Sequence, residues 1–378
     1  MKILLSDIRN RKSFDIYNIL KRHYGDNEIL LASSDPFYLR GRIIYFHKIY
    51  CLRKTGQTLF NEDLLSIGRA FSKDVVVYIP VEEDTTLFFL NFIKEKGNLN
   101  FKYNLPSLES FNISRDKFLL NEFCKNNGIP APSFFTDPRM MPANNEFVPL
   151  IVKPRIGSGA KGLFSVISRA EFYKFSHINL NEYVIQEKIG DGKTVEGAFF
   201  LCNKGKVLSS YCHKRERTFP LDGGVTVYSK LVYNKDILQT GKKLLEKLKW
   251  SGIAMLEFLQ DVKTGEYKVI EINPRFWGSV LLSEFSGANF VSAYIKTALG
   301  EEPVINENKK NVAIRWLAFD ILNWIKRRGK IRGFWHLNKR NTCYINCTYA
   351  KVFSSILFHL FFYISKENFK VFLKKWKK

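Results

Sequence analysis

The chain lacks the features that mark exported or membrane-spanning proteins. Its six cysteines show no C-x-x-C pair and no spacing typical of a disulfide framework, so we expect reduced thiols. The apolar run at the beginning, Ile3 to Leu5, is too short for a signal peptide and indicates a cytoplasmic protein. A later apolar run, Val352 to Ile364, falls short of the about 20 residues that span a bilayer.

Acidic residues are few compared with basic ones, 36 against 59, and the formal net charge is +23. This excess favours acidic partners such as nucleic acid, anionic lipid or phosphorylated small molecules, although a general lysine bias explains it equally well. No base-stacking or groove-reading motif accompanies the charge, and we therefore expect no nucleic-acid partner. A length of 378 residues with 46% hydrophobic residues predicts a folded protein of two or three domains.

The amino-terminal part alternates strand-like and helix-like segments. Residues 2–6, 28–34 and 74–80 have strand patterns, and the last of them is continuous and β-branched like a buried parallel strand. Residues 13–24 and 82–97 have helical spacing. The pattern predicts an α/β domain, but no G-x-G-x-x-G lies at a strand-to-helix turn, where a dinucleotide-binding Rossmann domain requires it.

A glycine loop lies between two predicted strands, residues 147–154 and 162–168. Gly157, Gly159 and Gly162 have the spacing G-x-G-x-x-G. A dinucleotide fold requires a helix after the loop, a protein kinase places its lysine on a later strand, and a Walker loop requires G-K-[ST]. The chain meets none of these requirements. The loop is therefore either a flap whose backbone N–H groups approach phosphates or a mobile surface hairpin.

A second hairpin, residues 251–278, carries an oxygen-rich strand face. Glu271 and Asn273 are two apart on one strand, so their side chains point to the same face, and Glu257 lies on the partner strand. Two carboxylates and an amide oxygen suit Mg²⁺, which fills its remaining positions with water and nucleotide phosphates. A solvated polar face is the alternative, but Glu271 lies in an apolar run, where an unpaired carboxylate is costly.

Two further segments have weaker patterns. Ser114 can cap a helix that ends at Gly128. Residues 182–200 predict a strand followed by an abrupt polar turn, where the backbone of Glu187 to Ile189 can hydrogen-bond an adenine edge and Glu196 can accept from ribose hydroxyls. A plain strand–turn–strand is the commoner meaning of this second pattern.

The order of these parts resembles that of the ATP-grasp enzymes over about residues 1–300. The pattern consists of a lysine on a helix before I-P-x-P, a lysine before a glycine flap, a Q-E-x-I hinge, a carboxylate, and E-x-N-P-R. The corresponding residues are Lys117, Lys153 before Gly157 to Gly162, Gln186 to Ile189, Glu257, and Glu271 to Arg275. The chain is most similar to the carbamoyl-phosphate-synthetase-like and D-aspartate-ligase-like branches of carboxylate–amine ligases.

The resemblance implies an α/β protein with the ATP-grasp fold, in which two α+β subdomains enclose ATP behind a Rossmann-like pre-grasp domain. We expect the pre-grasp domain at residues 1–110, the ATP-grasp domain at 111–303, and a helical, basic and aromatic carboxy-terminal extension at 304–378. In that extension, residues 312–333 predict an amphipathic helix with a basic end. Residues 352–364 predict a buried helix or a helix lying on anionic lipid, which would place the protein at the inner membrane face beside a lipid-linked glycan.

The resemblance also implies a role for each matched residue. The ATP phosphates would be bound by Lys117, Lys153 and the flap residues Gly157, Ser158, Gly159 and Gly162. Adenine would be held by the backbone of Glu187, Lys188 and Ile189, ribose by Glu196, and Mg²⁺ or Mn²⁺ by Glu257, Glu271 and Asn273. Arg275 would face the transferred phosphoryl group or the acyl phosphate. Of Lys214, Arg215 and Arg217, which lie in a region that supplies cations to the reaction centre, strand alternation puts the two arginines on one face. We expect His213 to be a packing or surface residue.

The implied reaction activates a small-molecule carboxylate as an acyl phosphate at the expense of ATP, and an amine then attacks it. Similar ligases are associated with cell-surface polysaccharide synthesis. Alternatives are coupling to a thiol, carbamoyl-type chemistry, or a non-catalytic nucleotide-binding scaffold at a membrane surface. A homodimer is the expectation by base rate.

Overall fold

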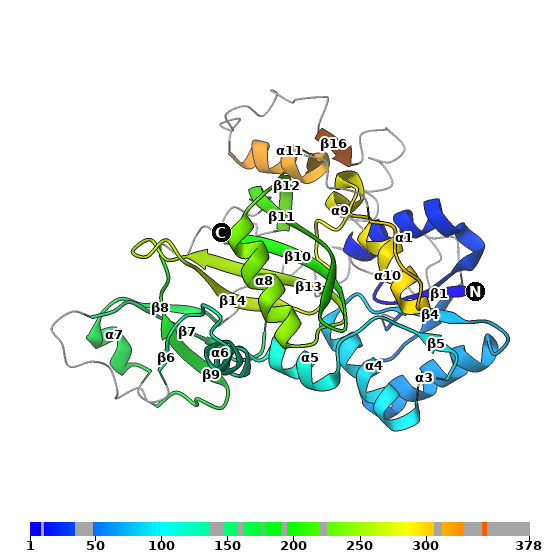
Figure 1. The fold of residues 1–378 in the computed structure, drawn as a ribbon, viewed down its shortest axis with the longest axis horizontal. Helices are drawn as coiled ribbons and strands as arrows, with labels where there is room; N and C mark the ends of the chain where they lie inside the picture. The colour runs from blue at the N-terminus through cyan, green and yellow to red at the C-terminus, as the bar shows by residue number, and fades with distance from the viewer. Residues whose placement is uncertain are drawn as a thin grey trace. The chain divides into compact units, whose positions relative to one another are not determined.

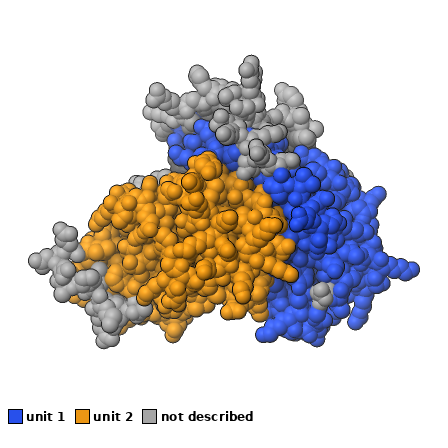
Figure 2. All heavy atoms as spheres, in the orientation of Figure 1, with its two compact units in different colours: residues 1–105, 213–232, 275–378 blue, residues 106–212, 233–274 orange. Residues whose placement is uncertain are grey.

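The computed structural model describes residues 1–8, 11–34, 48–97, 99–135, 147–157, 162–175, 177–190, 195–219, 225–305, 312–327 and 342–345 (Figure 1). These residues belong to two compact units, coloured separately in Figure 2. The first unit consists of residues 1–105, 213–232 and 275–378, and the second of residues 106–212 and 233–274. The chain passes between the units after Leu105, within strand β11 (Lys206–Phe219), after Val232 and again after strand β14 (Tyr267–Asn273).

The first unit contains a parallel sheet with the strand order β3-β2-β1-β4-β5. Its strands are β1 (Lys2–Leu5), β2 (Ile29–Ser33), β3 (Ile49–Cys51), β4 (Val76–Ile79) and β5 (Phe101–Lys102). Every adjacent pair is parallel, with Ile3 opposite Ile29 on one side and Val77 on the other. This arrangement confirms the predicted α/β domain.

Helices cover this sheet. They are α1 (Arg11–Tyr24), α3 (Gln57–Ala70), α4 (Glu83–Lys96), α9 (Leu281–Ser286) and α10 (Phe290–Leu299), with a short 3₁₀ helix η1 at Asp26–Glu28. Helix α3 packs beside α4, whereas α1 packs beside α9 and α10 (Figure 1). Between α3, α4 and the sheet lies an aromatic core in which the rings of Tyr78 and Phe89 are 4.3 Å apart.

The second unit contains a four-stranded antiparallel sheet with the order β6-β9-β7-β8. The strands are β6 (Phe134–Phe135), β7 (Leu150–Pro154), β8 (Phe164–Val166) and β9 (Tyr183–Glu187), and helices α5 (Leu108–Arg115), α6 (Lys117–Asn126) and α7 (Arg169–Tyr173) belong to the same unit. Strands β7 and β8 pair antiparallel, with Val152 opposite Phe164. The glycine loop therefore connects two paired strands, as predicted.

A second sheet in this unit contains β10 (Glu196–Asn203), β13 (Gly252–Gln260) and β14, with β13 between the other two. Helix α8 (Lys235–Lys247) packs against one face of it. Gly241 makes this contact close, because a Cβ at that position would collide with the ring of Phe200. In the first unit, strands β12 (Val225–Val232), β15 (Ala313–Trp316) and β16 (Thr342–Ile345) follow one another.

The helix that carries Lys117 begins later than predicted. Its N-cap is Asp116, whose carboxylate accepts from the N–H groups of Phe118 and Leu119, whereas Ser114 lies inside the preceding helix α5. A carboxylate at this position satisfies two amides that the first turn leaves without partners.

The carboxy-terminal extension also differs from expectation. Residues 313–316 form strand β15 rather than the first turn of a helix, because they pair with β12, and helix α11 covers only Leu317–Lys326. The apolar run at residues 352–364 lies outside the described residues. None of the helices seen in the described ranges is long and apolar enough to cross a membrane.

Candidate functional site

Glu257 and Glu271 lie directly opposite each other across the β13–β14 hairpin. Residues in this relation have Cβ atoms about 4.5–5.5 Å apart on one face of the sheet. Asn273 is two residues further along the same strand and only 4% exposed, whereas both carboxylates are half-buried. The structure thus brings the three predicted metal ligands to one face of one hairpin, and their oxygen atoms are the donors that Mg²⁺ prefers.

Lys153, at the end of β7 in the other sheet of this unit, is near the same carboxylates. Burial, together with the nearby Lys117, lowers the pKa of its ammonium to about 8, against Glu271 and Glu257, which raise it. The side chain is 8% exposed, and these charges affect its pKa because they lie close to it. Two lysines, one from β7 and one from α6, and two carboxylates from the β13–β14 hairpin therefore converge within the second unit.

Lys117 is hydrogen-bonded to the residues at which the glycine flap starts. It is the first residue of α6 and is buried. Its backbone N–H donates to the carbonyl of Arg155 at 3.0 Å, and its Nζ donates to the carbonyl of Gly157 at 2.9 Å. The start of the helix and the start of the flap are thereby held together.

Arg155 was not predicted, although it follows the lysine motif directly in the sequence. Its Nη2 and Nε donate to the carboxylate of Asp116 at 2.7 and 3.1 Å, and its guanidinium lies 4.8 Å from the ring centroid of Phe118. A planar guanidinium suits such a two-point contact. The sequence offered one signal for this pair: Asp116 directly precedes Lys117, and Arg155 lies two residues after Lys153.

The ends of the flap require glycine. Gly157 has φ 147° and Gly162 has φ 70°, both in the range that favours glycine. A Cβ on Gly162 would also lie 3.1 Å from Cγ of Pro154. The other two predicted flap residues, Ser158 and Gly159, lie outside the described residues.

Two of the three backbone N–H groups in the segment predicted to bind adenine donate to carbonyl groups of the protein itself. The N–H of Glu187 donates to Ser133 O at 2.9 Å, and the N–H of Lys188 donates to Pro149 O at 2.8 Å. Ile189 is 3% exposed, and its N–H has no acceptor within the ranges that the structure describes. Of the three predicted N–H groups, this one is available to an adenine edge.

Glu196 lies on a different face of the sheet from the predicted metal ligands. The β10–β13 register offsets it by one residue from the position opposite Glu257, so that it lies on the other face of the sheet, where α8 packs. Its carboxylate oxygens accept from Asn234 Nδ2 at 3.0 Å and from the hydroxyl of Tyr267 at 2.9 Å. Glu196 thus tethers the start of α8, and its contact with ribose stays a prediction.

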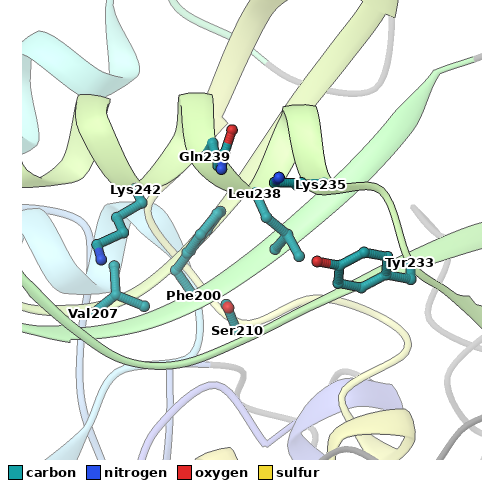
Figure 3. Close-up of a pocket in the computed structure, with 8 residues that line it drawn as sticks. All are labelled: Phe200, Val207, Ser210, Tyr233, Lys235, Leu238, Gln239 and Lys242. Atoms are coloured by element: carbon teal, nitrogen blue, oxygen red, sulfur yellow. The ribbon is translucent and has the colours of Figure 1, made fainter.

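A shallow pocket of about 180 Å³ also lies on the α8 side of this sheet. Figure 3 shows Phe200 of β10 at its base, with Lys235 and Lys242 of α8 beside it. The pocket is lined by none of the residues predicted for ATP or metal binding.

The predicted cations of the reaction centre belong to the first unit. Along β11, Lys214 and Glu216 are exposed, whereas Arg215 and Arg217 are partly buried, which confirms the predicted alternation. His213 is buried on the same side as the arginines. Arg215 lies close enough to His213 to lower its pKa.

Arg217 is engaged in an ion pair that the sequence did not reveal. Its Nε and Nη2 donate to the carboxylate of Asp320 at 2.8 and 2.5 Å, and its guanidinium lies 4.3 Å from the ring centroid of Tyr228. Asp320 and its second partner, Arg315, are fully buried. Arg217 thus has a structural partner, and its role at the reaction centre stays a prediction.

We expect Asp320→Ala to lower the free energy of unfolding by about 3–5 kcal/mol, because it leaves two arginines without their carboxylate in a buried environment. Glu216→Ala is the matched control, since Glu216 forms an exposed pair with Lys230 at 3.6 Å and should change stability by less than about 1 kcal/mol. Urea unfolding of both variants measures the difference. Equal stabilities would show that the buried pairs do not stabilise the fold.

His213 is a packing residue, as predicted. It is 4% exposed, and its Nδ1 lies 3.0 Å from the hydroxyls of both Ser229 and Ser279. Burial, together with the nearby Arg215, lowers its pKa from 6.5 to about 3. The imidazole is therefore neutral in the folded protein at neutral pH.

Acid should destabilise the protein through His213. Between pH 6.5 and about 3 the unfolded chain binds a proton at this histidine that the folded chain does not, so stability falls as the pH drops below 6.5. We expect the thermal midpoint of His213→Gln to decrease less from pH 7 to 4 than that of the unaltered protein, because the variant lacks this histidine. The control His177→Gln, at an exposed position, should show the same decrease as the unaltered protein. Identical pH profiles for His213→Gln and the unaltered protein would contradict the assignment.

A family model and a curated relative each match part of the chain. Residues 114–279 match the family model of the ATP-grasp domain. D-aspartate ligase from Enterococcus faecium (strain Aus0004) is 30% identical over 89 residues, which are 22% of this chain and 21% of that protein. The match thus spans about a fifth of the length of this curated relative.

Two solved structures show the likeness of the fold. The biotin carboxylase domain of 2-oxoglutarate carboxylase from Hydrogenobacter thermophilus superposes with a TM-score of 0.63 at 15% identity, over 82% of this chain and 73% of that one. L-amino acid ligase from Bacillus licheniformis superposes with a TM-score of 0.58 at 17% identity, over 79% of this chain and 74% of that one. At these identities the likeness concerns the architecture.

Proposed function

Since the chain has the ATP-grasp fold and residues 114–279 are its ATP-grasp domain, we propose that the protein is an ATP-dependent ligase that joins a carboxylate to an amine through an acyl phosphate. The observation that carries this proposal is the convergence of Lys153 and Lys117 with Glu257 and Glu271 within the second unit. Two cations next to two carboxylates suit a nucleotide triphosphate together with its metal ion.

Each of the predicted site residues has its own role in the proposed reaction. Lys153 and Lys117 bind the phosphates, and the flap that Lys117 anchors covers them. Glu257, Glu271 and Asn273 hold Mg²⁺ or Mn²⁺, which when bound neutralises phosphate charge. The N–H of Ile189 donates to adenine. Exclusion of water by the flap protects the acyl phosphate from hydrolysis until the amine attacks.

Hydroxylamine tests the proposal without knowledge of the amine. The full chain is incubated with ATP, Mg²⁺, hydroxylamine and a panel of amino acids, hydroxy acids and uronic acids, and ADP and hydroxamate are measured. Acid-dependent hydroxamate supports the proposal. ATP binding without ADP release on any acid would contradict it and favour a nucleotide-binding scaffold.

A finer proposal is a role in cell-surface polysaccharide synthesis. It is supported by the resemblance to ligases of that kind and predicts that uronic acids are among the acids that yield hydroxamate. Activity confined to amino acids or hydroxy acids would contradict it.

A further inference from the structure

The pocket on the α8 side of the sheet is lined by none of the residues to which the proposed reaction gives a role. It has a volume of about 180 Å³, and all its lining residues belong to the second unit. Glu257 is paired with Gly197 of β10, and Phe200, at the base of the pocket, lies three residues further along that strand. Because side chains alternate along a strand, Phe200 and Glu257 point to opposite faces of the sheet. The pocket is therefore separate from the site proposed for ATP and the metal ion.

The base of the pocket is apolar. Phe200 is buried, and Leu238 of α8 and Val207 of β11 lie on either side of its ring (Figure 3). Gly241 keeps α8 close to this ring, because a Cβ at that position would collide with Cζ of Phe200. An apolar cavity of about 150 Å³ is large enough for benzene, so this pocket has room for one six-membered ring.

A tyrosine borders the pocket at the start of α8. Tyr233 is 80% exposed, and Figure 3 shows its hydroxyl end pointing toward Leu238. A ring bound on Phe200 would contact Tyr233 and remove apolar surface of both aromatic side chains from water.

Two lysines give the pocket a positive rim. Lys235 and Lys242 of α8 are exposed, and none of the eight lining residues is acidic. The acidic residues near them on this helix, Asp236 and Glu246, do not line the pocket. Neither lysine forms an ion pair or a hydrogen bond with any residue that the structure describes. A ligand with negative charge is complementary to this rim.

The lysines lie at two ends of the pocket. Lys242 follows Lys235 by seven residues, which is two helical turns or about 10 Å along one face of α8. Figure 3 shows Lys242 on the side of Val207 and Lys235 on the side of Tyr233, with Phe200 between them. A flat ring that carries an anionic group at each end would reach both lysines.

Hydrogen bonds fix the start of α8 to the sheet. Asn234 is the N-cap of α8, and its Nδ2 donates to the carboxylate of Glu196 at 3.0 Å. The hydroxyl of Tyr267 on β14 donates to the same carboxylate at 2.9 Å. Asn234 lies between Tyr233 and Lys235 in the sequence, so these bonds position the backbone of both pocket residues before a ligand arrives, as a binding site requires.

We propose that this pocket is a second ligand site and that it binds a small aromatic acid, whose ring lies on Phe200 beside Tyr233 and whose anionic groups contact Lys235 and Lys242. The apolar base accepts a ring of either charge state, and the lysines select the anionic one. Carboxylates and phosphates share the required chemistry. The proposal does not depend on the ligase function, because the pocket shares no residue with the proposed catalytic site.

Fluorine NMR on the full chain tests the site. The probe is 4-fluorobenzoate, and 4-fluorobenzamide, which has the same ring without the charge, is its matched control. We expect the acid to bind about 5-fold more tightly than the amide, because a contact with an exposed lysine contributes about that much. Equal binding of the two, or no binding of the acid, overturns the proposal.

Competition against the bound probe identifies the acidic group. Terephthalate, with a carboxylate at each end of its ring, should displace 4-fluorobenzoate at a concentration about 5-fold lower than benzoate, because it reaches the second lysine. Phenyl phosphate tests the phosphate in the same way. Acetate, which has the charge without the ring, should not displace the probe. Displacement by acetate as effective as that by benzoate overturns the proposal, as does displacement by neither terephthalate nor phenyl phosphate.

Lysine variants assign the anionic contacts. The double variant Lys235→Met, Lys242→Met should bind 4-fluorobenzoate about as weakly as 4-fluorobenzamide, whereas Lys247→Met, at an exposed position of α8 outside the pocket, should bind it like the unaltered protein. An unchanged preference for the acid in the double variant overturns the assignment.

Tyrosine variants assign the contact with the ring. Tyr233→Ser should weaken binding of the acid and of the amide alike. The control is Tyr173→Ser, at a 68% exposed position of α7 in the same unit, and it should leave both unchanged. Unaltered binding of both compounds by Tyr233→Ser removes the tyrosine from the site.

The double lysine variant also distinguishes this pocket from the catalytic site, which by the proposed function binds a carboxylate of its own. ADP and hydroxamate formation by the variant should equal that of the unaltered protein. Loss of both ADP formation and binding of 4-fluorobenzoate in a folded double variant would overturn the proposal of a separate site. Binding of the aromatic acid by a protein without ADP release on any acid would overturn the ligase function alone.

Discussion

Glu271→Gln is expected to lower the rate of ATP turnover by about 10³-fold while leaving the thermal midpoint of unfolding nearly unchanged. Loss of several kcal/mol of metal-assisted charge stabilisation corresponds to that factor. The amide keeps the shape of the side chain, but it removes one of the two carboxylates that face each other across the hairpin. It also removes a negative charge that supports the protonated form of Lys153.

The measurement is ADP release at saturating ATP and Mg²⁺, with Glu266→Gln as the control. Glu266 lies exposed near the turn of the same hairpin, outside the group of carboxylates and lysines. Its substitution should leave turnover within about twofold. Turnover by Glu271→Gln close to that of the control would remove the metal role proposed for this carboxylate.

Lys153→Met is expected to weaken ATP binding and to reduce kcat/KM for ATP by about 10²- to 10³-fold. The methionine fills the same volume but cannot pair with phosphate, and a charge-assisted contact in a buried site contributes that much. The lysine is 8% exposed, so bulk water cannot replace the lost donor easily.

Equilibrium binding of ATP distinguishes this effect from misfolding, with the exposed Lys174→Met of the same unit as the control. The control should bind ATP normally, and both variants should unfold at similar temperatures. Normal ATP binding by a folded Lys153→Met would place the nucleotide elsewhere.

The parts of the site that the sequence predicted depend on local patterns. Strand alternation alone places Glu271 and Asn273 on one face, and a short turn brings Glu257 opposite, so the arrangement of the proposed metal ligands follows from a hairpin of about 20 residues. The flap is equally local, because two strand patterns flank it. The parallel sheet of the first unit follows from its buried, β-branched segments.

The parts that were wrong or missed depend on contacts between distant segments. Strand alternation predicts that the side chain of Glu196 lies on one face of its sheet. Which face this is depends on the pairing of β10 with β13, which the sequence does not show. Arg217 looked available because its partner, Asp320, lies 103 residues later in the chain. Lys12 and Glu82 form an ion pair of 2.8 Å across 70 residues of sequence, and no local pattern predicts that they meet.

The pairing of β12 with β15 limits how this protein can be dissected. Residues 114–279 carry the family match, but β15 lies beyond them and pairs with β12 through Tyr228 opposite Arg315 and Lys230 opposite Ala313. A fragment cut at the matched residues would expose the unpaired backbone of β12 as an open sheet edge, next to an arginine deprived of Asp320. Such an edge recruits strands from other copies, so the isolated domain should self-associate, and the shortest well-behaved fragment must extend past Asp320.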